Sequence, residues 1–262
     1  MCLIAVALHA RDDLTLVLVG NRDEFHERPA APLGWQAAGG AEYLGGRDLQ
    51  AGGTWLALSR AGRLGAITNF RTGTAAEPGL ASRGELVTNW VTGSDSAAAF
   101  ADSLVRTADR YAPYNLLYGC AATGKLHYFS NRTATPLAVG RGVHGLSNHL
   151  LNTAWPKTTR TTRRLRQTLA LPGPLQDEAL FMLLADREGA PDAELPDTGV
   201  GLDFERLLAP PFIVSERYGT RCSSVVTVSL GGQCSFVERR FDAQGNVAGQ
   251  HHEQFRLATA PG

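Results

Sequence analysis

Two apolar stretches lie close together at the start of the chain, MCLIAVAL (residues 1–8) and TLVLVG (residues 15–20). Leu3–Leu8 and Thr15–Gly20 have the length of β-strands, and the turn-forming residues 11–13 (RDD) lie between them. This pattern predicts a β-hairpin. Both runs are continuously apolar instead of alternating with polar residues, so we expect both faces of the two strands to be covered.

The remaining elements follow in the order strands, helices, strands, helices, strands. Loops are expected over 29–46, which is rich in Pro, Ala and Gly, and over 189–201. Further strands are expected at Thr54–Ser59, Leu64–Asn69, Tyr114–Ala121, Lys125–Asn131, Pro136–Asn148, Ser223–Leu230, Gln233–Phe241 and His251–Leu257. Helices are expected at Arg83–Val91, at Asp95–Arg110 with Ser94 or Asp95 as N-cap, at Pro156–Leu171 and at Gln176–Arg187. Hairpins dominate, which predicts an α+β fold with antiparallel sheets: one domain over 1–262, built as a four-layer αββα sandwich with helices outside and two sheets inside.

Composition argues against several classes of function. The 262 residues include 25 basic and 25 acidic side chains, and this balance argues against a dedicated nucleic-acid-binding protein. No apolar run approaches the roughly 20 residues of a membrane-spanning helix, and the first apolar run has no basic segment before it, so neither a membrane anchor nor a signal peptide is expected. We therefore expect a cytoplasmic protein with four reduced cysteines. No cysteine or histidine has metal-ligand spacing, so neither a metal nor a cofactor is expected.

Cys2 is the first candidate for chemistry because it follows the initiator methionine. An initiator methionine is removed when a small residue follows it, and the mature chain is then expected to begin with a cysteine. Such a residue carries a thiol nucleophile and an α-amine, with a pKa near ~7.7–8.0, that can accept the thiol proton. The alternative is structural: unpaired cysteines are usually buried, and Cys2 would then be a small apolar residue at the start of a strand.

Four polar residues, Asn21, Arg22, Asp23 and Glu24, follow directly on the second apolar run. Polar side chains at the end of a buried strand are costly unless they are paired or face a cleft. In an antiparallel hairpin the end of the second strand lies beside the start of the first, which places these residues next to Cys2. There an arginine could hold a thiolate and an aspartate an ammonium group. The alternative is a solvated turn with an Arg–Asp ion pair.

Several motifs occur in order along the chain. They are MCLIAVAL (1–8), GNRDEFHERPAAPLGW (20–35), GGRDLQAGGTWLAL (45–58), GRLGAITNFR (62–71), SRGELV (82–87), YNLLYG (114–119), GLSNHLLNTAWPK (145–157) and YGTRCSSVV (218–226). This set resembles the NRDE family, also called the transport-and-Golgi-organisation-2 (TANGO2) family. That family is similar to N-terminal-nucleophile (Ntn) hydrolases, especially the choloylglycine hydrolase and penicillin V acylase branch. The resemblance implies an Ntn-hydrolase-like αββα sandwich and hydrolysis of linear amide bonds by an N-terminal cysteine.

The resemblance also assigns roles around the first hairpin. Cys2 would act as nucleophile and, through its amine, as base. Arg22 and Asp23 would support the nucleophile and the amine. In the acylases two residues separate this Arg and Asp, whereas here the two are adjacent, so Asn21 and Glu24 are alternatives for these places.

Further along the chain, the resemblance assigns an oxyanion donor and a second arginine. Asn148 would donate its side-chain amide to the developing oxyanion, and Asn69 is a second candidate. Arg221 matches a late arginine of the acylase site. Trp55 lies beside glycines, and we expect it to line the pocket and to bind substrate together with Asn21 and Asn69.

A run of basic residues marks the expected helix at 156–171. Its members are Lys157, Arg160, Arg163, Arg164 and Arg166. Three of them recur at helical spacing, which predicts a solvated outer face. The alternative is a patch for an anion or an acidic partner.

Two functions of different classes follow from these features. The first is a cysteine amidohydrolase that cleaves a small linear N-acyl amide through an acyl-enzyme, with the pKa of the Cys2 thiol lowered by a neighbouring arginine. The second is a non-catalytic carrier or chaperone of the same fold that binds an apolar ligand such as haem or lipid. In both cases Cys120, Cys222 and Cys234 are expected to be buried in strands.

Overall fold

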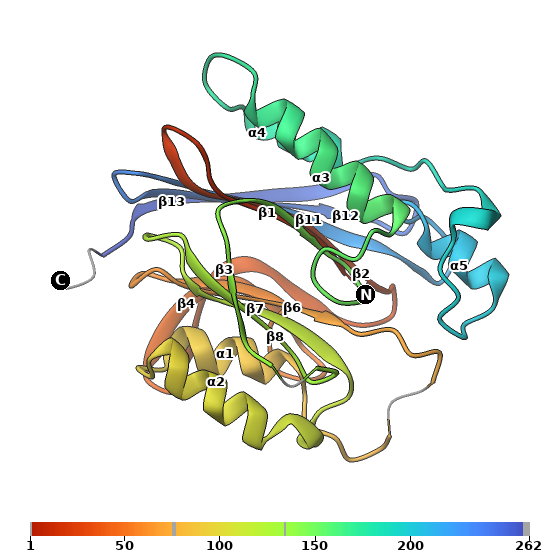
Figure 1. The fold of residues 1–262 in the computed structure, drawn as a ribbon, viewed down its shortest axis with the longest axis horizontal. Coiled ribbons are helices and arrows are strands. Elements are labelled where there is room, and N and C mark those ends of the chain that lie inside the picture. Colours follow the sequence, from red (N-terminus) through yellow and green to blue (C-terminus); the bar gives the residue numbers. More distant parts are fainter. Residues whose placement is uncertain (1, 75–76, 134, 259–262) are drawn as a thin grey trace.

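The computed structural model describes residues 2–74, 77–133 and 135–258, and their strands form two antiparallel sheets (Figure 1). The first sheet has six strands in the order β10-β1-β2-β11-β12-β13. They are β1 (Cys2–Arg11), β2 (Leu14–Phe25), β10 (Gly142–Leu146), β11 (Tyr218–Ser229), β12 (Gln233–Phe241) and β13 (Val247–Arg256). The second has seven strands in chain order from β3 to β9. They are β3 (Ala30–Ala38), β4 (Ala41–Asp48), β5 (Leu56–Ser59), β6 (Arg63–Asn69), β7 (Tyr114–Cys120), β8 (Lys125–Ser130) and β9 (Leu137–Val139).

Helices cover the outer face of each sheet. The pair α1 (Gly84–Thr92) and α2 (Ala97–Arg106) packs on the seven-stranded sheet, and the pair α3 (Pro156–Leu169) and α4 (Asp177–Leu184) packs on the six-stranded sheet. A fifth helix, α5 (Leu202–Leu208), lies at the end of the sandwich where the chain starts (Figure 1). The layers therefore follow the order helix, sheet, sheet, helix, which confirms the predicted αββα sandwich.

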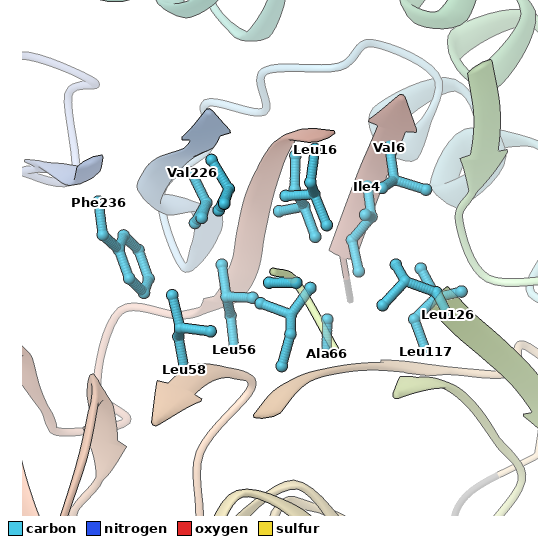
Figure 2. Close-up of a cluster of buried hydrophobic side chains, with 14 of the residues drawn as sticks. Ile4, Val6, Leu16, Leu56, Leu58, Ala66, Leu117, Leu126, Val226 and Phe236 are labelled. Atoms are coloured by element: carbon cyan, nitrogen blue, oxygen red, sulfur yellow. The ribbon is translucent and has the colours of Figure 1, made fainter. Parts of the chain in front are cut away.

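The buried side chains of β1 explain why its sequence is continuously apolar. Ile4 and Val6 face the second sheet and join the core between the two sheets (Figure 2). Ala5 and Ala7 point the other way, into a separate core beneath α3 and α4. Because successive residues of a strand point to opposite faces, a strand covered on both sides needs apolar residues at every position. The expectation of two covered faces is confirmed.

The predicted loop at 29–46 is wrong. This stretch forms most of the hairpin β3–β4, in which Trp35 pairs with Leu44. Alanine and glycine have low β-propensity, so this stretch shows only a weak strand pattern, but pairing with β5 and packing against the core determine the conformation. The predicted N-cap of α2 is also wrong by one or two positions: Ser96 is the cap, and its side chain accepts a hydrogen bond from the N–H of Ala99 at 3.2 Å.

The register of β1 and β2 places the polar end of the hairpin. Cys2 pairs directly with Arg22, as the hairpin argument predicts. The polar residues 21–24 do not follow the strand, however, because β2 continues through them to Phe25.

None of the helices in the described part of the chain is long and apolar enough to cross a membrane.

Candidate active site

A cleft of about 370 Å³ opens at the polar end of the β1–β2 hairpin. It lies between that hairpin and the segments that lead into α1. Its charged lining residues are Arg22, Asp23, Glu24, Arg28, Asp48, Glu77 and Arg83. Cys2 lines the same cleft and is half-buried. Ordinary small-molecule pockets have volumes of about 300–1,000 Å³, so the cleft can take a small ligand.

Arg22 lies beside Cys2 on the neighbouring strand, and its guanidinium stacks on the Trp55 ring. Directly paired residues of neighbouring antiparallel strands project to the same face, so both side chains point into the space between the sheets. The Cζ atom of Arg22 lies 4.6 Å from the centre of the Trp55 ring. Its Nη2 atom lies 3.6 Å from Asp48 Oδ2 and 3.9 Å from Glu24 Oε2. A Cβ atom at Gly46 would lie 2.1 Å from the Trp55 ring, so a side chain there would displace the tryptophan.

Asp23 lies next to Arg22 in the strand and therefore projects to the opposite face. Its side chain is fully buried, and Oδ1 accepts a hydrogen bond of 2.7 Å from Thr220 Oγ1. Burial raises the pKa of Asp23, although the nearby charge of Lys157 and the bond from Thr220 act in the other direction. The carboxyl group is thus one element of a buried polar cluster beneath the start of β1.

Asn148 belongs to the same region but its amide is already engaged. Its Nδ2 donates to the backbone carbonyl of Asn69 at 3.0 Å, and its Oδ1 accepts from Ser147 Oγ at 3.3 Å. Ser147 Oγ also lies 3.3 Å from the carbonyl oxygen of Cys2, which connects this segment to the start of β1. Asn148 is fully buried, whereas Asn69 lines the cleft.

The structure separates the other two predicted residues from the cleft. Arg221 lies at a bulge in β11, and its Nη1 donates to the carbonyls of Phe25, His26 and Arg28 at 2.8, 3.0 and 3.3 Å. It therefore fixes the turn after β2. Asn21 donates to the carbonyls of Leu184 and Pro211 at 2.9 and 2.8 Å. Among the predicted site residues, the cleft brings together Cys2, Arg22, Asp23, Glu24, Trp55 and Asn69.

Two cations near the site were not assigned to it from the sequence. Arg83, directly before α1, lines the cleft. Lys157, in the first turn of α3, is only 3% exposed, and its Nζ donates to the carbonyl of Leu208 at 3.0 Å. Burial lowers the pKa of Lys157 to about 8, against the opposing effect of the Asp23 charge. The spacing of residues along the helix indicates that Lys157 is buried. Thr161 and Leu165 follow it by four and eight residues and share its helix face, and both are buried.

The assignment of the whole basic run to a solvated face is therefore wrong at Lys157. It is also too simple for Arg160, which pairs with the carboxylate of Asp186 at 2.9 Å and has a side chain only 15% exposed. Arg163 and Arg166 are exposed, and Arg164 is 45% exposed. Only these last three match a solvated face.

The thiols differ from the expectation in two ways. Burial raises the pKa of the Cys2 thiol, and the lowering effect of the Arg22 charge does not overcome it. The expected lowered pKa is thus wrong for the chain with Met1 attached. Cys222 and Cys234 are buried as expected, with 4% and 0% exposure, but Cys120 is half-buried.

Among the described residues, no group of three or more His, Cys, Asp and Glu side chains is arranged to hold a metal ion.

Comparison with known proteins places the chain in a family. The family model for Transport and Golgi organisation 2 matches residues 1–243. The chain belongs to the TANGO2 family. It is similar to the Transport and Golgi organization 2 homologs of Mus musculus, with 29% identity over 238 residues, and of Homo sapiens, with 30% identity over 242 residues; each alignment covers 86% of both chains.

Among solved structures, the TANGO2-family chain shows a distant likeness to two proteins. One is the Caenorhabditis elegans N-acylethanolamine-hydrolyzing acid amidase ortholog, with 8% identity and a TM-score of 0.46 over 86% of this chain and 92% of that one. The other is a mutant of the conjugated bile acid hydrolase from Clostridium perfringens. It has 12% identity and a TM-score of 0.46 over 98% of this chain and 97% of that one.

The burial of Lys157 gives a direct test of the site in this TANGO2-family chain. The sequence contains two lysines, Lys125 and Lys157. We expect an amine-reactive acylating reagent to modify the exposed Lys125 of the folded protein rapidly and to leave Lys157 unmodified. Peptide mass spectrometry after a time course measures both rates, and the unfolded protein provides the control in which the rates converge. Equal rates in the folded protein would contradict the buried position of Lys157.

Proposed function

We propose that the chain is an N-terminal-cysteine amidohydrolase that cleaves a small linear N-acyl amide. The observation that carries this proposal is the position of Cys2: its thiol opens into a cleft beside the Arg22 guanidinium. Removal of Met1 would add a free α-amine to the same residue. A nucleophile, a base and a cationic neighbour would then meet at one end of the cleft.

The raised thiol pKa indicates which step the amine must perform. A thiol whose pKa lies above its ordinary value is protonated near neutral pH, so the sulfur needs a base before it can attack. The α-amine of Cys2 takes the thiol proton, and the thiolate adds to the amide carbonyl carbon. Arg22 stabilises the negative sulfur before the attack.

The tetrahedral intermediate requires hydrogen-bond donors for its oxyanion. The side-chain amide of Asn69 suits this role better than that of Asn148, because Asn69 lines the cleft while Asn148 Nδ2 is bonded to a backbone carbonyl. The ammonium group of Cys2 returns its proton to the leaving nitrogen, the C–N bond breaks, and the released amine leaves a thioester on Cys2. Water, deprotonated by the same amine, attacks the thioester, releases the carboxylic acid and restores the thiol.

The test controls the N-terminus directly. The chain is prepared with a cleavable N-terminal extension whose removal leaves Cys2 as the first residue, and both forms are assayed with a panel of N-acyl amides. We expect amine release only after cleavage, together with a mass increase equal to the acyl group on Cys2 in rapidly quenched samples. Intact-mass measurement of the untagged protein establishes whether Met1 is removed during expression.

The same preparation distinguishes the carrier function. The cleaved protein and its Cys2→Ala variant are titrated with haem and with fatty acid. Absence of amine release with every substrate, combined with binding that depends on Cys2, would contradict the hydrolase and favour the carrier. Amine release that is equal with and without the extension would contradict the role of the α-amine.

A further inference from the structure

The outer edge of β13 is a long strand edge that no other strand of the described chain covers. β13 is the last strand of the six-stranded sheet, and none of its ten residues is buried. It contains neither proline nor lysine, and the register shift in its ladder with β12 lies at its first residues. The unpaired N–H and C=O groups of such an edge readily pair with a strand of another chain.

The other three sheet edges are shorter or protected. β9 has three residues and β10 has five. Asn152 also covers β10, because it bonds to the N–H of Gly145 at 3.0 Å and to its C=O at 2.7 Å. β3 contains Pro32, between the residues Ala31 and Gly34 where its register shifts. Short length, proline and irregular register all disfavour pairing with a further strand. Among the described strands, β13 is therefore the edge suited to an interface.

The ladder with β12 determines which backbone groups of β13 point outward. The N–H of Leu257 donates to the carbonyl of Gly232 at 2.9 Å, and this pair continues the register in which Arg256 pairs with Gln233. Hydrogen-bonded pairs alternate along an antiparallel ladder. The odd-numbered residues of β13 therefore bond to β12. The N–H and C=O groups that point away from the sheet belong to the even-numbered residues, among them Gln250, His252 and Gln254.

We propose that β13 pairs antiparallel with β13 of a second copy of this chain, with His252 of each copy directly opposite the other. This pairing joins the two six-stranded sheets into one. The outward backbone groups of Gln250 then meet those of Gln254 in the second copy. On the other face His251 lies opposite Glu253 of the second copy, where an imidazole N–H can donate to the carboxylate. The interface is thus self-complementary.

The neighbouring registers are less favourable. A pairing centred on Glu253 sets two carboxylates directly opposite each other, and like charges in this position are destabilising. A pairing centred on His251 sets the two His251 rings opposite each other and leaves Glu253 opposite Gly249, which has no side-chain donor. Of these three registers, the one centred on His252 gives each Glu253 a donor across the interface. None of the described residues that line the Cys2 cleft belongs to β13, so the pairing is independent of the proposed hydrolase function.

The first test removes one outward N–H group from each copy. Sedimentation equilibrium of the full chain over a range of concentrations, up to about 100 μM, measures the dissociation constant of the dimer. We expect His252→Pro to raise this constant at least about tenfold, because proline lacks the N–H that faces the second copy but leaves the ladder with β12 intact. His252→Ala is the matched control: it also loses the 2.8 Å contact of the His252 ring with Ser235 but keeps the N–H, and it should dimerise like the wild type.

A second pair of variants tests the register without introducing proline. His251→Glu sets like charges opposite each other and should weaken the dimer at least about tenfold, while the double variant His251→Glu, Glu253→Lys restores opposite charges and should recover it. A monomer at every concentration would overturn the proposal. So would a dimer that His252→Pro and His252→Ala affect equally, or one that the double variant does not recover.

Discussion

Cys2→Ala is expected to reduce the rate of amide hydrolysis by at least about 10³-fold, because loss of a catalytic nucleophile removes the covalent step altogether. The fold should persist. Cys2 is half-buried at the start of β1, and the loss of so small a group costs at most ~1–2 kcal/mol of the free energy of unfolding. Initial rates of amine release and thermal melting curves of the two proteins check both statements.

Cys120→Ala provides the matched control for this prediction. Cys120 is also half-buried and is the last residue of β7, but that strand belongs to the seven-stranded sheet and Cys120 does not line the Cys2 cleft. Its variant should keep full activity. Hydrolysis that persists in Cys2→Ala would show that the thiol is not the nucleophile. A large drop in melting temperature for this variant would assign Cys2 to the structural alternative.

The first hairpin shows how much of the site could be predicted from the sequence. The two apolar runs have one short turn between them, so an antiparallel pair has few possible registers, and the pairing of Cys2 with Arg22 follows. The side-chain period of two then points the Arg22 side chain into the space between the sheets and the Asp23 side chain to the opposite face, and both residues line the cleft. Local sequence was sufficient here because the partners are only about twenty positions apart.

Arg83 and Asn148 show why the rest could not be predicted in the same way. Arg83 reaches the cleft because Gly53 and Gly84 allow their segments to meet, a contact between residues 31 positions apart that no periodicity signals. Asn148 was assigned to the oxyanion by its motif. Whether its amide is free depends on a bond to the carbonyl of Asn69, in a different sheet from the preceding strand β10. Helix α5 was not predicted, and its place depends on a buried ion pair with residue 71.

Breaking the Arg71–Glu205 ion pair is expected to have the largest effect on the free energy of unfolding. The Arg71 and Glu205 side chains are only 5% and 4% exposed, and Nη1 lies 2.5 Å from Oε2. Glu205→Gln keeps the shape but leaves the guanidinium without its counter-charge. Breaking a buried pair from one side costs about 3–5 kcal/mol of the free energy of unfolding, which lowers the melting temperature by roughly 10 °C in a chain of this size. Differential scanning calorimetry measures the change.

An exposed ion pair on the same helix supplies the comparison. Arg206 contacts Asp192 at 2.6 Å, but both side chains are about half exposed, so water screens the charges. Asp192→Asn should therefore melt close to the wild type. Glu205→Gln should also slow hydrolysis, because Arg71 donates its backbone N–H to the Asn148 carbonyl at 2.8 Å and Ser147 connects that segment to Cys2. Equal melting temperatures for the two variants would contradict a stabilising role for the buried pair. A stability loss without any loss of activity would show that the Asn148 segment holds its position without it.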